Sequence, residues 1–275
     1  MNKTDKQGYN ELYRGRDSDL ISCSGAAAYV NAFEETRIAP FHKGGGTKGY
    51  VRGLATQRML DAAASTGRAA RDITVLDGGC GQGELSVYLA CKGFKVIGID
   101  ISEEACERSS HLAQQIGVDN VRFEATSLES TGLENECVDF VIGHASLHHF
   151  IKYEGVADEL RRVLKPGGEM FFADSFGENK AYHLFHNKEE MERLGDVILT
   201  KSLIEGFFGG LHVTIYPTDW FVMLDKLVLK VLPHSRQPMA RALSRVWWHL
   251  DRWMPKSRAS LYLAGAVMTH VEKRS

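Results

Sequence analysis

An acidic residue stands on each side of a glycine-rich turn in VLDGGCGQGE, residues 75–84. Asp77 precedes the glycines and Glu84 follows them. The dinucleotide-binding pattern G-x-G-x-x-G places a pyrophosphate at the N-terminus of the following helix. Gly79 and Gly81 match its first two positions, but the third falls on Glu84. Because two carboxylates there would repel a pyrophosphate by ~1–4 kcal/mol, the turn favours a ligand that carries positive charge.

A third carboxylate, Asp100, ends the next apolar run, KVIGID at 95–100. An acidic residue at this distance after such a turn is typical of ribose binding. Each hydrogen bond from a ribose hydroxyl to a charged carboxylate contributes about 1.5–3 kcal/mol. S-adenosylmethionine combines a ribose diol with an ammonium and a sulfonium group and has no phosphate. The three acidic residues therefore favour this cofactor over NAD.

Alternating strands and helices must hold these residues at one edge of a sheet. The pattern predicts strands at 73–77, 95–100, 120–125, 137–143 and 169–175, a helix at 84–92, a helix that Ser102 caps and Gly117 ends, and a helix at 153–164 closed by KPGG at 165–168. This alternation predicts an α/β fold with a doubly wound, mostly parallel sheet and strand 73–77 near its centre. Two further strands, at 212–217 and 261–273, bring the sheet to seven.

The composition excludes several other classes of protein. Of the 275 residues, 44% are hydrophobic and 25% are charged, and the net charge of -2 gives no reason to expect a nucleic-acid partner. Five dispersed cysteines form no C-x-x-C pair, so neither a disulfide scaffold nor a structural zinc site is expected. The stretch MNKTDKQGYNELYRGRDSDL lacks the apolar core of a signal peptide, and no uninterrupted apolar run reaches the ~18 residues of a membrane span, so neither is expected. A cytoplasmic location is therefore expected.

Five motifs occur in the order VLDGGCGQG, GIDIS, VRFEATSLES, CVDFVIGHASLHHF and LKPGG. In this order they resemble the class I S-adenosylmethionine-dependent methyltransferases, in the small-molecule branch. The resemblance covers 73–175 well, 41–72 loosely and the C-terminal hundred residues hardly at all. It implies the Rossmann-like fold of that family and S-adenosylmethionine as cofactor.

The resemblance also implies roles for individual residues. Asp77 would lie near the cofactor's ammonium group, Asp100 would hold the ribose, and Ile101 would pack against adenine. Thr126 departs from the acidic residue that the family often has at the adenine edge, so it can accept a hydrogen bond but carries no charge. The predicted cofactor-binding residues are Asp77, Gly79, Gly81, Gly83, Asp100, Ile101, Thr126, Ser127 and His144, the last through its backbone carbonyl.

Histidines follow the fourth expected strand, in HASLHHF at 144–150. A base is needed only if the methyl acceptor must lose a proton, and a histidine base adds about 10²–10⁴-fold to a rate. His149, and after it His148, are the candidate catalytic residues. The alternative is a helical turn with one ring packed and the other solvated. His144 and His148 have metal-ligand spacing, but no cysteine or carboxylate pattern accompanies them, so no metal is expected.

The segment before the core contains FHKGGGTKGY at 41–50. In several small-molecule methyltransferases a His-x-Gly segment at this place closes over the cofactor, although a flexible linker explains the glycines equally well. Tyr29, His42 and Tyr50 are the candidate acceptor-binding residues, with burial in the core as the alternative for the aromatic ones.

The stretch 221–258 carries eight basic and two acidic residues among apolar ones, which predicts basic amphipathic helices. They could cap an apolar acceptor site, touch a membrane peripherally, or pack on the sheet with a solvated basic face. We thus expect four segments. They are a helical leader or lid at 1–72, a cofactor-binding core at 73–217, a helical insert forming a cap at 218–260 and a final strand at 261–275.

The sequence therefore predicts an enzyme that moves a methyl group from S-adenosylmethionine to oxygen, nitrogen or activated carbon of a small hydrophobic metabolite. No nucleic-acid partner is expected, and the sequence indicates no oligomeric state. Two alternatives stay open. One is an NAD-dependent oxidoreductase, which the flanking acids disfavour, and the other is a non-catalytic cofactor-binding or scaffold protein.

Overall fold

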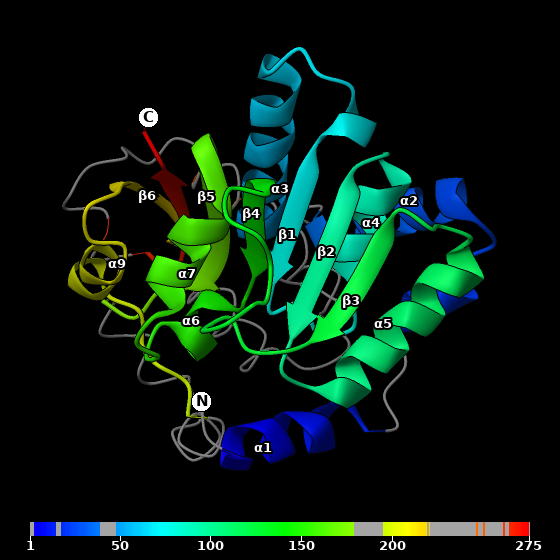
Figure 1. Ribbon diagram of the computed structural model, residues 1–275, viewed down its shortest axis with the longest axis horizontal. Coiled ribbons are helices and arrows are strands. Elements are labelled where there is room, and N and C mark those ends of the chain that lie inside the picture. Colours follow the sequence, from blue (N-terminus) through cyan, green and yellow to red (C-terminus); the bar gives the residue numbers. More distant parts are fainter. Residues whose placement is uncertain are drawn as a thin grey trace.

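The computed structural model describes residues 3–14, 18–38, 48–178, 195–218, 220, 246, 250, 261 and 264–274. Its centre is a seven-stranded sheet in the order β3-β2-β1-β4-β5-β7-β6 (Figure 1). The strands are β1 Thr74–Gly78, β2 Lys95–Asp100, β3 Val121–Ala125, β4 Val138–His144, β5 Leu164–Ser175, β6 His212–Thr218 and β7 Ala266–Glu272. β1 to β5 pair in parallel, whereas β7 is antiparallel to both β5 and β6. The predicted mostly parallel, seven-stranded sheet is confirmed.

Helices cover both faces of the sheet, and this explains why the central strands are apolar on both sides. Val75 and Leu76 are neighbours on β1 and both are fully buried, but they belong to separate hydrophobic clusters. Residues of the leader and of α4 and α5 pack with Val75, and those of α6, α7 and α9 pack with Leu76. The helices are α1 Lys3–Tyr13, α2 Ala26–Phe33, α3 Lys48–Ser65, α4 Glu84–Cys91, α5 Glu103–Ile116, α6 Leu147–Phe150, α7 Val156–Val163 and α9 Lys201–Phe207.

Two residues determine where α5 begins and ends, as predicted. The Ser102 hydroxyl accepts a hydrogen bond from the Ala105 N–H at 3.1 Å, which satisfies one of the free donors of the first turn. Gly117 follows the last turn at φ 80°, a left-handed conformation that glycine adopts without steric cost. These caps set the length of the helix that leads from β2 to β3.

The segment KPGG at 165–168 was expected to be a separate turn, and this prediction is wrong. β5 begins at Leu164, because the C-terminal chain pairs with the segment. The Gly167 N–H donates to the Lys273 carbonyl at 2.8 Å, and the Lys273 N–H donates to the Gly168 carbonyl at 3.0 Å. The helix expected at 153–164 is also shorter and starts after Gly155, at Val156.

The leader packs directly on the sheet. Tyr29, Phe33 and Met59 are buried in the same cluster as Val75 of β1. Three short helical segments follow its longer helices: Asp19–Ser22 after α1, Glu34–Ile38 after α2, and Ala70–Asp72 between α3 and β1. The division of the chain into four segments stays a prediction, since most of 218–260 lies outside the described residues. Four residues of the predicted insert are described: Thr218 ends β6, Trp220 is buried, and Val246 and Leu250 are helical and exposed. Among the described helices, none has the length and apolar character to cross a membrane.

Candidate cofactor site

A cavity of about 260 Å³ opens at the carboxyl ends of β1, β2 and β4. Ligands of open α/β sheets bind at this edge, where the strand order reverses around β1. The cavity brings together every predicted cofactor residue except Gly83. Its predicted lining residues are Asp77, Gly79, Gly81, Asp100, Ile101, Thr126, Ser127 and His144.

The glycines have two different tasks. Gly79 lies at φ 75°, and a Cβ there would come within 2.7 Å of the Ser146 Cβ. Gly83 lies outside the cavity lining and caps α4, where a Cβ would come within 2.6 Å of the Ser109 Cβ on α5. Gly79 therefore lets the turn pack against Ser146 in the cavity lining, whereas Gly83 lets it pack against α5.

Asp100 is fixed by the glycine turn itself. Its two carboxylate oxygens accept hydrogen bonds from the N–H groups of Gly81 and Ser102, both at 2.9 Å. Burial raises the pKa of the Asp100 carboxyl, and these backbone hydrogen bonds oppose the rise. A carboxylate oxygen has two lone pairs, so each oxygen can still accept from one hydroxyl of a ribose.

Asp77 is a buried acidic residue in a site that favours a cation. It is 1% exposed, and the Ser86 hydroxyl donates to it at 2.6 Å. Burial raises the pKa of Asp77 to about 7, and the neighbouring charge of Asp100 adds to the rise. No basic side chain of the described residues forms an ion pair with it. An ammonium group in the cavity would therefore stabilise the charged form of Asp77.

Whereas Asp77 is acidic, Arg52 of α3 is a basic residue at the same site, and no sequence motif predicted it. It lines the cavity, and no carboxylate in the described part of the chain lies within ion-pair distance of its guanidinium. Burial lowers the pKa of Arg52, and the more distant charges of Glu84 and Asp174 offset this only in part. Asp77 and Arg52 thus present one negative and one positive group to the cavity, which suits the ammonium and carboxylate of an amino-acid zwitterion such as the methionine end of S-adenosylmethionine.

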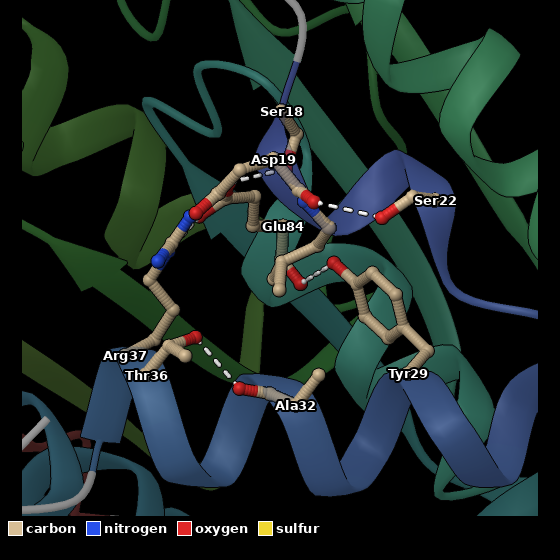
Figure 2. Close-up of polar contacts among 9 residues, drawn as sticks. Ser18, Asp19, Ser22, Tyr29, Ala32, Thr36, Arg37 and Glu84 are labelled. Atoms are coloured by element: carbon tan, nitrogen blue, oxygen red, sulfur yellow. Dashed lines mark hydrogen bonds and ion pairs between the residues drawn. The ribbon is translucent and has the colours of Figure 1, made fainter. Parts of the chain in front are cut away.

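Glu84 does not act on the cavity as an isolated charge. The Arg37 guanidinium donates to both of its carboxylate oxygens, at 2.6 and 2.9 Å, and the Ser18 hydroxyl donates at 2.5 Å (Figure 2). Arg37 also pairs with Asp19. Because Arg37 is shared between Glu84 and Asp19, it compensates the charge of Glu84 only in part, so Glu84 should repel a phosphate less than an isolated carboxylate would. The preference for a cationic ligand at this turn therefore depends mainly on Asp77.

His149 is one of two histidines that line the cavity. Its Nδ1 lies 2.7 Å from the Asp196 Oδ1 and 2.8 Å from the Tyr9 hydroxyl. The pairing with a carboxylate fixes the orientation of the ring, as in catalytic histidine–aspartate pairs. Asp196 lies 47 residues further along the chain, and no motif of the sequence marks it.

The other two histidines have different surroundings. His148 lies outside the cavity lining, and its Nδ1 is 2.7 Å from Asp174 Oδ1 at the end of β5. His144 is in the lining, and its Nε2 is 3.0 Å from the Thr56 hydroxyl. Burial, together with the charge of Arg52, lowers the pKa of His144 to about 3, so its ring is neutral.

Helix α1 supplies two lining residues that the sequence did not indicate, Tyr9 and Tyr13. The helix is docked on α5, because Lys6 pairs with Glu103 at 2.7 Å and the Ser102 hydroxyl donates to Asn10 at 2.7 Å. Figure 1 shows α1 lying across the carboxyl edge of the sheet. Its polar sequence carries no apolar stripe that would have predicted this position.

The predicted acceptor residues are not assembled at the cavity. Tyr29 is fully buried, and its hydroxyl donates to the Glu84 carbonyl at 2.9 Å, so its assignment to an acceptor pocket is corrected to a core position. Tyr50 is half-buried and does not line the cavity. His42 lies outside the described residues. Instead, Tyr9, Phe33, Phe150 and Tyr153 give the cavity its aromatic wall.

Comparison with known proteins agrees with this fold. Residues 69–215, just over half of the chain, match a methyltransferase-domain family model. The geranyl diphosphate C-methyltransferase of Streptomyces coelicolor has a similar fold, with a TM-score of 0.58 and 14% identity over 100% of this chain and 99% of that one. A putative sarcosine dimethylglycine methyltransferase from Galdieria sulphuraria has a TM-score of 0.55 and 18% identity over 94% and 99%.

Curated relatives are more similar in sequence but cover less of the chain. The ubiquinone biosynthesis O-methyltransferase of Parvibaculum lavamentivorans is 30% identical over 50% of this chain and 54% of its own length. The 27-O-demethylrifamycin SV methyltransferase of Amycolatopsis mediterranei is 34% identical over 44% and 45%. The chain thus spans about half the length of these relatives.

The fold and the cavity define a Rossmann-like nucleoside-binding domain of the methyltransferase type. With the family match, the chain belongs to the class I S-adenosylmethionine-dependent methyltransferases. Its cofactor is S-adenosylmethionine.

Proposed function

We propose that this protein transfers a methyl group from S-adenosylmethionine to a small, hydrophobic acceptor. The observation that carries the proposal is the charge pattern of the cavity, in which Asp77, Arg52 and Asp100 offer complementary partners for an ammonium, a carboxylate and a ribose diol. When bound, the cofactor supplies an electrophilic methyl group on a sulfonium. The protein's main contribution is then positioning, which can remove ~7–11 kcal/mol of a barrier.

Every predicted cofactor residue except Gly83 has a place in this proposal. Asp100 holds the ribose hydroxyls, Asp77 the ammonium and Arg52 the carboxylate. The Thr126 hydroxyl donates to the Ser130 carbonyl at 3.3 Å, so its free lone pair can accept from the adenine amino group. Gly79, Gly81, Ile101, Ser127 and the backbone of His144 complete the binding surface.

His149 is proposed as the base for an acceptor that must lose a proton, with Asp196 as the residue that positions it. The pair supports this role because His149 lines the cavity while Asp196 holds its Nδ1. In this arrangement the Nε2 of His149 is the atom that would take the proton. His148, which contacts Asp174 instead, is proposed to anchor the helix α6 on β5.

The acceptor is proposed to be a small molecule for two reasons. Aromatic side chains line the cavity, and no basic stretch borders the predicted methyl-transfer residues in the sequence. Its reacting atom is oxygen, nitrogen or activated carbon, and the named relatives include O-, N- and C-methyltransferases. The tRNA 5-carboxymethoxyuridine methyltransferase of Escherichia coli is also a relative, 31% identical over 126 residues, so RNA is the competing acceptor class. We further propose a cytoplasmic location, which the five free cysteines support.

An acceptor screen with methyl-labelled S-adenosylmethionine tests this function. The protein is incubated with phenols, carboxylic acids, amines, terpenoids and bulk tRNA, and label in each product is counted. We expect transfer to one small-molecule class, a loss of about 10²–10⁴-fold in kcat for His149→Ala, and a smaller loss for Asp196→Asn with little change in cofactor affinity. The matched control, His111→Ala on the exposed side of α5, should keep full activity.

Two results would contradict parts of the proposal. Label in tRNA alone would replace the small-molecule acceptor by RNA. Full activity of His149→Ala on the preferred acceptor would remove the histidine base.

A further inference from the structure

Four side chains with metal-ligand chemistry meet on one face of the antiparallel end of the sheet, away from the cofactor cavity. They are Glu169 on β5, His212 on β6, and His270 and Glu272 on β7. Glu272 pairs in register with both Glu169 and His212, and His270 lies two residues before it. Side chains two residues apart on a strand point to the same face, so all four lie together.

The cluster is remote from the cavity. Glu169 pairs with Phe140 near the start of β4, whereas the cavity adjoins His144 at the end of that strand. The cluster is therefore independent of the residues proposed for methyl transfer.

The charges of this cluster are unusual for a sheet. Glu169 and Glu272 stand directly opposite each other, and like charges at such a pair are destabilising. A histidine contacts each of them, with His270 Nε2 2.5 Å from Glu169 Oε2 and His212 Nδ1 2.8 Å from Glu272 Oε2. Arg274 adds a contact to Glu272 at 3.3 Å but is mostly exposed. The arrangement thus brings two carboxylates and two imidazole rings together, a combination of oxygen and nitrogen ligand atoms that suits a metal cation between them.

The geometry of three of these residues is close to that of a coordination site. One ligand atom from each of Glu169, His270 and Glu272 lies within 4.8 Å of the other two. The His270 ring is held by stacking on Phe171, with ring centres 4.7 Å apart and an angle of 9° between the planes. Two ligand atoms at about 2.0–2.2 Å from a tetrahedral ion are roughly 3.4 Å apart. Small side-chain rotations are therefore enough to bring the three ligand atoms to this separation.

We propose that Glu169, His270 and Glu272 bind a divalent transition-metal ion, with His212 as a fourth ligand. Imidazole nitrogen combined with carboxylate oxygen suits Zn²⁺, whereas Mg²⁺ and Ca²⁺ prefer oxygen ligands alone. His212 already contacts Glu272, and its half-exposed ring is free to turn toward the ion. The ion joins β5, the last of the parallel strands, to β7 and β6, which complete the sheet.

Zinc binding by the full-length protein tests this proposal. After treatment with a chelator, the protein is titrated with Zn²⁺ by calorimetry at pH 7.5, and its melting temperature is measured with and without the ion. We expect one equivalent to bind and the melting temperature to rise, because an ion that binds only the folded state stabilises it. Replacing Zn²⁺ by Co²⁺ should give the visible absorption of a four-coordinate site.

Matched variants decide which residues bind the ion. His270→Ala should no longer bind this equivalent of Zn²⁺, or should bind it at least tenfold more weakly. Glu169→Gln provides a second variant in case His270→Ala fails to fold. A second group of described residues with suitable ligand atoms is His148, His149 and Asp196, of which His149 lines the cavity. Retention of the equivalent by both sheet variants, or its loss in His149→Ala, would overturn the proposal, as would the absence of any Zn²⁺ binding. Methyl-transfer activity should be unchanged in His270→Ala, which separates this site from the proposed function.

Discussion

Asp77 has a buried carboxyl beside the glycine turn, and its pKa of about 7 links cofactor binding to pH. We predict that affinity for S-adenosylmethionine falls as the pH drops below about 7, because the neutral acid no longer attracts an ammonium. Asp77→Asn should bind weakly and show little of this pH dependence. Calorimetric titrations between pH 5.5 and pH 8.5 measure both effects. Equal pH dependence of binding in the two proteins would contradict the assignment of Asp77 as the partner of the ammonium group.

The same pKa affects the stability of the cofactor-free protein. A folded-state pKa above the ordinary value of 3.8 means that the folded protein retains a proton that the unfolded chain has lost. The contribution of Asp77 to the free energy of unfolding is therefore fully present below about pH 4 and is lost as the pH rises to about 7. The loss reaches at most ~4 kcal/mol for a shift of about three units. Without cofactor, Asp77→Asn should accordingly gain stability over the wild type between pH 4 and pH 8.

At the scale of residues, contiguous motifs predicted the site better than isolated side chains did. The glycines and Asp100 could be placed because the turn and the strand end fix them within one short segment. Arg52 and Tyr9 could not, since each reaches the cavity from a distant segment without a pattern of its own. The same holds for Asp196, which contacts His149 from a distant segment. Tyr29 was misassigned because an aromatic residue in a sequence does not reveal whether it faces a pocket or the core.

At the scale of elements, the first residue of α4 connects the leader to the core. Glu84 accepts hydrogen bonds from Arg37 and Ser18, and both Glu84 and Arg37 are about one-fifth exposed. We predict that Glu84→Gln lowers the free energy of unfolding by about 1–3 kcal/mol, because a partly buried guanidinium loses its charged partner. Urea denaturation measures this loss.

A matched variant tests whether burial is the cause. Glu103→Gln breaks the exposed Lys6–Glu103 pair, which should cost less than about 1 kcal/mol. Equal losses in the two variants would contradict the role of Glu84 as the attachment point of the leader.

The element boundaries could be predicted where the signal was local. Ser102 and Gly117 mark the ends of α5 by their own chemistry. The start of β5 could not be predicted, because it depends on pairing with Lys273, more than a hundred residues away in sequence.

At the scale of the whole molecule, the alternation of strands and helices up to Ser175 was sufficient to predict the parallel half of the sheet. The last two strands could be recognised as strands, but their order could not, since β7 enters between β5 and β6. This topology leaves the carboxyl edge around β1 open for the cofactor.

Calorimetric titration with S-adenosylmethionine and with NAD tests the central claim most directly. We predict saturable binding of S-adenosylmethionine, no binding of NAD, and at least tenfold weaker binding of S-adenosylmethionine by Asp100→Ala. Asp158→Ala, at an exposed position of α7, is the matched control and should bind like the wild type. Saturable binding of NAD without binding of S-adenosylmethionine would contradict the account.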